Sequence, residues 1–235
     1  SELASMLTGY GISGFAPDFL TAPGPQLNTW PEDGNSGIYY GAAFMFMAYF
    51  YERFGEDATI ELVKDPANGL MSIENTLNAL GITDPLTGEP ILLVDVFADW
   101  IAANKLNDTS LGDGRYGYSL DALPSLNVAA NTGTLSPSGN LVEVEGKQWA
   151  ADYLLLRGSN TPKTYQLAFE GDSQVGIVNA DAHSGTHMYW SNRADESDSR
   201  MTRMFDLSGV DSATLTYWTW YHIEEGWDYA YLMIS

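Results

Sequence analysis

Cysteine is absent from the 235 residues, so the chain has no disulfide, no thiolate zinc site and no cysteine nucleophile. Basic residues are scarce: 10 Lys and Arg stand against 31 Asp and Glu, which gives a formal net charge of −21. A chain this acidic repels phosphate backbones and anionic lipid heads. We therefore expect neither nucleic acid nor a membrane surface as a partner. The acidity indicates solubility or, as the alternative, cation binding.

Long apolar segments are missing as well. The longest apolar run, residues 41–51, is too short to cross a bilayer, for which about 20 residues are needed, so we expect no membrane insertion. Neither an initiating Met nor a signal-like segment stands at Ser1. The chain begins in a helical pattern and ends in a strand pattern, and we interpret it as a fragment.

Motifs typical of several enzyme classes are also absent. The sequence contains no Gly-x-Ser-x-Gly and no glycine-rich phosphate loop before a helix, which removes support for hydrolase-fold and nucleotide-binding functions. His183 and His187 are four residues apart, a spacing that binds zinc when both lie on one helix. However, Gly185 lies between them, and no Glu follows His183. We therefore predict no zinc site: His183 lies in a turn, His187 on a strand, and His222 is structural.

The first half of the chain has the periodicity of helices. Residues 38–54 are almost entirely apolar in their middle and predict a buried helix at the centre of a helical lobe, with Gly55 as its C-cap. Further helices are predicted at residues 1–7, 57–63, 69–80 and 91–104.

The second half changes to a periodicity of two. Residues 106–146 are rich in Asn, Thr, Ser, Gly and Pro and predict a loop or linker. Alternating patterns rich in Tyr and Trp then predict strands at residues 150–156, 164–169, 201–205, 213–221 and 228–234. The predicted fold class is α+β. A helical lobe at residues 1–105 is followed by the linker at 106–146 and by an incomplete antiparallel β-sandwich at 147–235.

Acidic residues of the second half gather in predicted loops. Glu170 and Asp172 follow a predicted strand, and Glu224 and Asp228 lie between two aromatic strands. Ca²⁺ binds about six to eight oxygen ligands, many of them carboxylates on loops. We predict a calcium site formed by Glu170, Asp172 and Asp228, with Glu224 as a further ligand. Acidic loops that are merely solvated are the alternative.

Two stretches resemble the immune inhibitor A group of secreted bacterial metallopeptidases. The first resembles the helical C-terminal lobe of the gluzincin (zincin-type) catalytic domain, and it is carried by residues 40–44, 51–55, 68–69, 97–100 and 103–104. The second is similar to the β-sandwich that follows the protease domain, and it is carried by residues 189–195, 202–207 and 220–230. Residues 169–171 and 183–185 are also similar to jelly rolls of the MAM type.

The resemblance implies a function for the full-length parent. Such gluzincins hold Zn²⁺ through a His-Glu-x-x-His helix and a later Glu in a Glu-Gly context, and neither is present here. The parent is then expected to be a Zn²⁺-dependent endopeptidase that cleaves proteins or peptides with zinc-activated water, whereas this chain alone is expected to be inactive. The resemblance also implies that Tyr40, or its neighbour Tyr39, lies on a wall of the active-site cleft and approaches the oxyanion. It further supports Glu170 as a calcium ligand.

A non-enzymatic function remains as the alternative. In that interpretation a helical spacer carries a sandwich that binds carbohydrate or protein through exposed Trp and Tyr side chains. A His-Glu-x-x-His sequence upstream of Ser1 would favour the peptidase, and its absence would favour the binding module. Both interpretations place the protein outside the cell, either secreted or on the bacterial surface.

Overall fold

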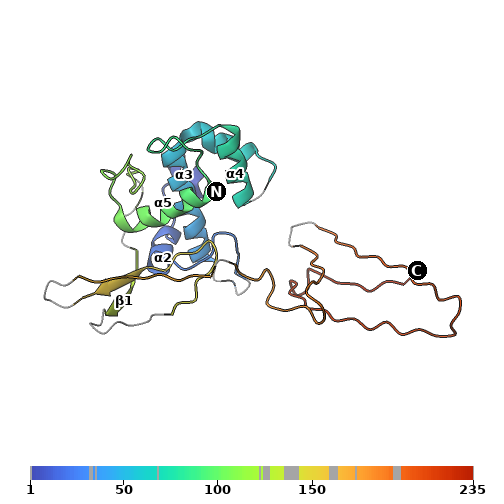
Figure 1. The fold of residues 1–235 in the computed structure, drawn as a ribbon. Coiled ribbons are helices and arrows are strands. Elements are labelled where there is room, and N and C mark those ends of the chain that lie inside the picture. The colour runs from blue at the N-terminus through green and yellow to red at the C-terminus, as the bar shows by residue number, and fades with distance from the viewer. Residues whose placement is uncertain are drawn as a thin grey trace. The chain divides into compact units, whose positions relative to one another are not determined.

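A computed structural model of the chain describes residues 2–31, 34, 36–67, 69–121, 123, 128–134, 143–158, 164–172, 174–192 and 197–234. The chain divides into two compact units, Ser1–Thr164 and Tyr165–Ser235, which we call the N-terminal and the C-terminal unit. Five helices lie in the described part of the N-terminal unit: α1 (Glu2–Leu7), α2 (Phe15–Thr21), α3 (Gly37–Lys64), α4 (Leu70–Ala79) and α5 (Leu93–Leu106). Two short strands, β1 (Asn131–Thr134) and β2 (Leu154–Arg157), follow them (Figure 1).

Helix α3 is the centre of the N-terminal unit, as the apolar run in its sequence predicts, because α1, α2, α4 and α5 all contact it. Its buried face includes Met45, Tyr49 and Phe50, which are 2% exposed or less. Each large apolar side chain removed from water in this way contributes about 1.5–3 kcal/mol to folding. The indole of Trp100 in α5 stacks on Phe19 of α2, with ring centroids 5.7 Å apart. This contact joins α2 and α5 in one core.

Glycine has a structural role at two positions of α3. Gly41 permits the close approach of α2, because a Cβ atom there would overlap the backbone carbonyl of Phe15 and lie 2.8 Å from the Cβ of Phe19. Gly55 has a φ of 84° inside the helix, a conformation that favours glycine. The sequence predicts separate helices at 38–54 and 57–63, and this is confirmed: α3 consists of two helical segments that meet in a kink at Gly55, where the backbone leaves helical geometry.

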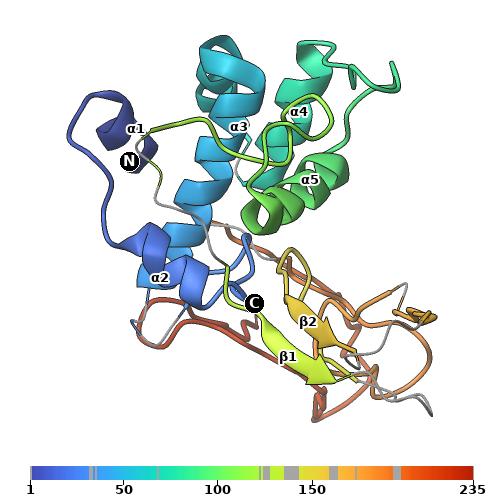
Figure 2. The same cartoon turned by 90° about the vertical axis from the view of Figure 1, so that its left-hand side faces the viewer.

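Strands β1 and β2 pair in parallel, with Asn131 opposite Leu154 and Gly133 opposite Leu156 (Figure 2). The strand predicted at residues 150–156 is therefore confirmed in its second half as β2. Its partner β1 lies inside the stretch predicted as a linker. The chain thus combines helices with a small two-stranded sheet, which is compatible with the predicted α+β class.

The predicted boundaries after residues 105 and 146 differ from the observed division after Thr164. Part of the predicted linker and the first residues of the predicted sandwich pack on the helices. The ring of Trp149 meets that of Phe97 edge to face, with centroids 5.3 Å apart. The Tyr153 hydroxyl donates a hydrogen bond to the carbonyl of Ile101, at 2.8 Å. Such contacts between distant residues are not encoded in local composition, which is why the sequence pattern places the boundaries elsewhere.

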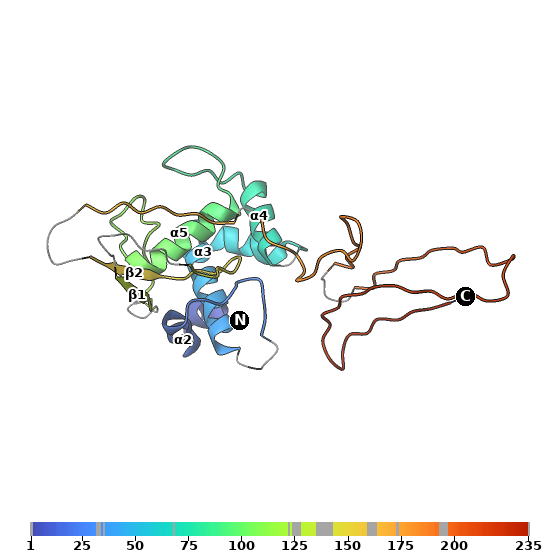
Figure 3. The same ribbon diagram turned by 60° about the horizontal axis from the view of Figure 1, so that its bottom comes forward.

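The C-terminal unit consists of long extended runs joined by turns (Figure 3). No segment forms a strand among its described residues, 165–172, 174–192 and 197–234. The backbone hydrogen bonds found there close turns, as in the bond from the Asp228 amide to the Glu224 carbonyl, at 3.0 Å. A strand requires a ladder of bonds to a neighbouring strand. The antiparallel sandwich, with its strands at 164–169, 201–205, 213–221 and 228–234, therefore stays a prediction.

Candidate functional site

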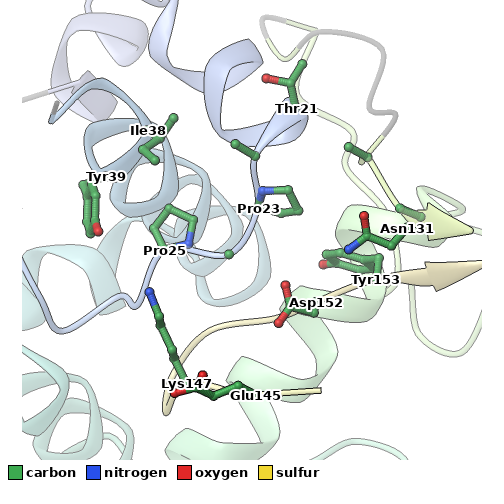
Figure 4. Close-up of a pocket in the computed structure, with 14 residues that line it drawn as sticks. Thr21, Pro23, Pro25, Ile38, Tyr39, Asn131, Glu145, Lys147, Asp152 and Tyr153 are labelled. Carbon is green, nitrogen blue, oxygen red and sulfur yellow. The ribbon is translucent and has the colours of Figure 1, made fainter. Parts of the chain in front are cut away.

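A cavity of about 500 Å³ opens in the N-terminal unit (Figure 4). Its lining comes from segments that are distant in sequence, namely residues 21–25 after α2, the first turn of α3, residues 129–131 at the start of β1, and residues 145–153 before β2. Pockets that bind small molecules have volumes of about 300–1,000 Å³. The cavity therefore has room for a small ligand.

Hydrogen bonds hold the walls of this cavity together. Three bonds join α2 and the loop after it to the two later segments: Ala129 N to Leu20 O at 2.8 Å, Leu27 N to Trp149 O at 2.9 Å, and Gln26 Nε2 to Gln148 O at 2.9 Å. A fourth bond, from Asn131 N to Tyr153 O at 2.8 Å, joins the two later segments to each other. These bonds fix the cavity walls in the absence of a ligand, which reduces the ordering that a ligand would have to impose.

Three charged side chains line the cavity, Glu145, Lys147 and Asp152. All three are exposed to solvent. In Figure 4 the Lys147 ammonium and the Asp152 carboxylate reach into the space between the walls, while Glu145 lies near Lys147. Pro23, Pro25 and Ile38 supply an apolar wall. The cavity thus offers charges of both signs next to apolar surface.

The two tyrosines at the start of α3 have different places. Tyr39 lines the cavity. Tyr40, predicted as the oxyanion-binding residue, is 40% exposed and packs in an aromatic cluster beside it: its ring stacks on Phe15 with centroids 5.3 Å apart and meets Trp30 edge to face at 4.7 Å. The catalytic role of Tyr40 stays a prediction.

A network of ions lies at another place in the same unit, around the guanidinium of Arg115. The Arg115 side chain is only 6% exposed. It binds Asp84 through two hydrogen bonds of 2.7 and 2.9 Å and Asp113 through two of 2.6 and 2.9 Å, and it lies 3.3 Å from Asp99. Such paired hydrogen bonds are the strongest that Arg makes with carboxylates. They hold the pKa of Asp84 well below its usual range, mainly through the bonds from Arg115 and with help from the Leu86 amide.

Tyr49 connects this network to α3. Its hydroxyl donates to the carbonyl oxygen of Arg115 at 2.9 Å and accepts from Arg53 Nη1 at 2.8 Å. Arg53 in turn binds Asp99 at 2.5 Å. Burial raises the pKa of Tyr49 to about 12, against the opposing effect of Arg53. The phenol therefore stays protonated at neutral pH and acts here as a structural donor between α3 and the loop that carries Arg115.

The structure places His183 in a bend and His187 directly after it. Residues 183–186 form a bend, and the ring of His183 stacks on Trp218 with centroids 3.9 Å apart. His187 is exposed, and its Nδ1 lies 2.8 Å from the Thr186 hydroxyl. Among the described residues, no three His, Asp or Glu side chains are grouped in a way that could hold a metal ion. A catalytic zinc is held by three protein ligands, and the absence of such a site from this chain stays a prediction.

A comparison with protein families shows which known domain the C-terminal residues resemble. Residues 158–235 match the family model of the MAM domain of immune inhibitor A-like proteins. This segment resembles an immune inhibitor A-like MAM domain. The resemblance to the immune inhibitor A group that the sequence predicts is thereby confirmed over these residues, which we call the MAM-like segment. No curated protein matches the chain.

The predicted calcium ligands all lie in the MAM-like segment. Glu170, Asp172, Glu224 and Asp228 are exposed, and the described residues contain no metal-holding group of three. Glu224 and Asp228 share one turn, in which the Glu224 amide lies 3.4 Å from the Asp228 carboxylate. Glu170 and Asp172 do not join them in a cluster. The calcium site stays a prediction that would require these loops to come together.

The sequence pattern missed the cavity completely. Its charged residues, Glu145, Lys147 and Asp152, lie in segments assigned to a linker and to the sandwich, and the wall formed by residues 21–25 received no assignment. No signal in a single sequence joins residues 21–25 to residues 145–153.

Among the helices that the structure describes, none has the length and apolar character that a membrane span requires.

Proposed function

We propose that the chain is part of a secreted Zn²⁺-dependent endopeptidase of the immune inhibitor A-like group. The N-terminal unit would be the helical lobe of its peptidase domain, and the MAM-like segment would be part of the following jelly-roll sandwich. The observation that carries this proposal is the match of residues 158–235 to the MAM domain of that group. A secreted peptidase meets proteins and peptides outside the cell, and these are the proposed substrates of the parent.

The N-terminal unit supports the proposal by its architecture. Helices pack around the buried helix α3, and a preformed cavity opens beside the first turn of that helix. Substrate clefts are concave surfaces that rigid elements hold open. In this proposal the face with Tyr39 and Tyr40 is one wall of a substrate cleft, and the zinc-bearing wall is supplied by other parts of the parent.

The chain alone is expected to cleave no peptide bond. The sequence has only three histidines and no His-Glu-x-x-His, and among the described residues no three His, Asp or Glu side chains are grouped around a possible metal position. A peptidase zinc is held by three protein ligands. The proposal therefore places the zinc ligands in sequence outside these 235 residues.

Zinc analysis together with a peptidase assay tests the proposal. The chain, and the same chain extended upstream as its gene encodes it, are dialysed against trace Zn²⁺ and assayed on an unfolded protein substrate. We expect one zinc and activity in the extended protein, and neither in the chain alone. His183→Ala and His187→Ala are compared with His222→Ala as a control. Zinc held by the chain and lost on either substitution, or an extended protein without zinc, would refute the proposal.

A binding module is the second candidate, because large aromatic side chains are exposed in the MAM-like segment. Tyr189, Trp218 and Trp227 are 89%, 72% and 78% exposed. Exposed aromatic residues are typical of surfaces that bind other molecules. Retention on insoluble polysaccharide, lost in a Trp227→Ala variant, together with an inactive extended protein, would favour this function over the peptidase.

A further inference from the structure

The charged side chains of the cavity are not paired with one another. Four of the eight Lys and Arg side chains that the structure describes have a carboxylate partner: Arg53 binds Asp99, Arg115 binds Asp84, Lys64 binds Glu61, and Arg200 binds Asp198. Lys147 has no such partner among the described residues, although Glu145 and Asp152 line the same cavity. Asp152 and Glu145 likewise accept no hydrogen bond from the described part of the chain. Lys147 and Asp152 thus line the same space without an ion pair between them.

This arrangement selects among ligands by their charge. A simple anion would be attracted by Lys147 but repelled by Asp152 and Glu145. A simple cation would be attracted by the two carboxylates but repelled by Lys147. A small molecule that carries one ammonium and one carboxylate group would satisfy both signs at once. Charge-assisted hydrogen bonds of this kind are roughly twice as strong as those between neutral groups.

The remaining lining adds an apolar contact. Pro23, Pro25 and Ile38 face the cavity from one side, and the backbone of Gly24 lies next to the Asp152 carboxylate, since a Cβ on Gly24 would be 3.5 Å from its Oδ1. Prolines and an aliphatic side chain present no hydrogen-bond donor to a ligand. They match an aliphatic side chain carried between the two charged ends.

We propose that this cavity binds a small zwitterion with an aliphatic side chain, either a free α-amino acid or a dipeptide. The ligand carboxylate is bound by Lys147, its ammonium group by Asp152, and its side chain by Pro23, Pro25 and Ile38. The binding needs no zinc and no peptidase activity. It can therefore fail or succeed independently of the proposed function.

Calorimetric titration of the 235-residue chain at low ionic strength tests the proposal. The probes are L-leucine and leucyl-leucine, which distinguish the two ligand sources, together with L-leucinamide, which lacks the carboxylate, and N-acetyl-L-leucine, which lacks the ammonium group. We expect saturable binding of at least one zwitterion, and binding at least about tenfold weaker for each blocked compound, as the loss of a hydrogen bond to a charged group predicts.

Two variants test which residue binds the carboxylate of the ligand and which binds its ammonium group. Lys147→Met should weaken binding of the zwitterion about tenfold or more and should remove the difference between L-leucine and L-leucinamide. Asp152→Asn should weaken it similarly and should remove the difference between L-leucine and N-acetyl-L-leucine. Lys105→Met and Asp121→Asn are matched controls, because both residues are exposed and neither lines the cavity. All four variants should keep the melting temperature of the unchanged chain.

Three results would overturn the proposal. One is the absence of saturable binding of both zwitterions at millimolar concentrations. Another is equal binding of the blocked and unblocked compounds by the unchanged chain. The third is an equal loss of binding in the control variants, which would show that net charge and not the cavity determines the affinity.

Discussion

Arg115 is the residue on which several loops of the N-terminal unit depend. Its guanidinium bonds Asp84 from the loop before α5, Asp113 from its own loop and, more distantly, Asp99 from α5. Three carboxylates around one buried cation are tolerable only while the cation is present. The same arrangement therefore makes this position unusually sensitive to substitution.

Replacing Arg115 by Met should destabilise the N-terminal unit by about 3 kcal/mol, because it leaves Asp84 and Asp113 without their cation, whereas Asp99 keeps its ion pair with Arg53. Urea unfolding followed by circular dichroism at 222 nm reports this unit, since the described helices all lie in it. Arg200→Met is the control: Arg200 pairs with Asp198 on the surface, with side chains 75% and 68% exposed, and should show no measurable effect. Equal effects of the two substitutions would contradict the prediction.

Acid should weaken the same network. The pKa of Asp84 is lower in the folded chain than its ordinary value of 3.8, and that of Asp113 is lowered as well, in both cases mainly by hydrogen bonds from Arg115. The folded state therefore binds fewer protons than the unfolded state in this range. The stabilisation that these two carboxylates give the folded state is complete at a pH above their ordinary pKa. It is lost as the pH falls from that value toward their lower pKa values in the folded chain.

Urea midpoints measured from pH 7 to pH 2 should therefore fall below about pH 5. The variant Asp84→Asn should be less stable than the unchanged chain at pH 7 and should show a shallower decline, because its residue 84 no longer titrates. An Asp121→Asn variant, altered at an exposed carboxylate, should keep the full decline. A decline of the same steepness in the Asp84 variant would exclude this carboxylate as its cause.

At the scale of elements, the contact between α2 and α3 depends on Gly41. An added methyl group would overlap the Phe15 carbonyl, so Gly41→Ala should force the two helices apart and cost about 3 kcal/mol. Gly37→Ala in the same helix is the matched control, because its Cβ would lie 3.4 Å from Phe15 Cδ1, an ordinary contact. That change should be neutral or stabilise by up to about 1 kcal/mol. Thermal unfolding of both variants provides the measurement.

The helices show how far local patterns determine structure. Predicted helices at 1–7, 69–80 and 91–104 correspond to α1, α4 and α5 within one or two residues at each end, because apolar periodicity and helix-ending glycines are local signals. Helix α2 and strand β1 went unpredicted, since both are short and are held by partners far away in sequence. The predicted calcium residues and Tyr40 followed from local composition and resemblance, whereas the cavity depends on contacts that no local pattern records.

At the scale of the whole molecule, the position of the unit boundary can be tested by truncation. A chain that ends at Thr164 should keep the helical signal and a cooperative thermal transition, because the contacts of Arg115, Trp149 and Tyr153 remain in it. A chain that ends at Leu106 keeps all five helices but lacks those contacts, and it should melt at a clearly lower temperature. Equal melting temperatures would support the boundary at residue 105 that the sequence predicts.

The calcium site also concerns the molecule as a whole, because its net charge of −21 attracts any cation. A specific site should raise the melting temperature in Ca²⁺ more than in Mg²⁺ or Na⁺ at equal ionic strength, since Mg²⁺ fits such a site poorly. The double variant Glu170→Gln, Asp228→Asn should lose this difference. Equal shifts in the three salts would leave only general screening of charge.

The hydrogen bond between Gln26 and the carbonyl of Gln148 joins positions 122 residues apart, and this fixes an order of events during synthesis. The ribosome releases α1 to α5 long before it releases the segment that closes the cavity. Because the helices are released first, we expect them to assemble first and the cavity to form last. The late closure remains feasible, since closing a loop of this length costs little more entropy than closing a loop of half its length. A nascent chain stopped just before residue 148 would then be helical but unable to bind a ligand.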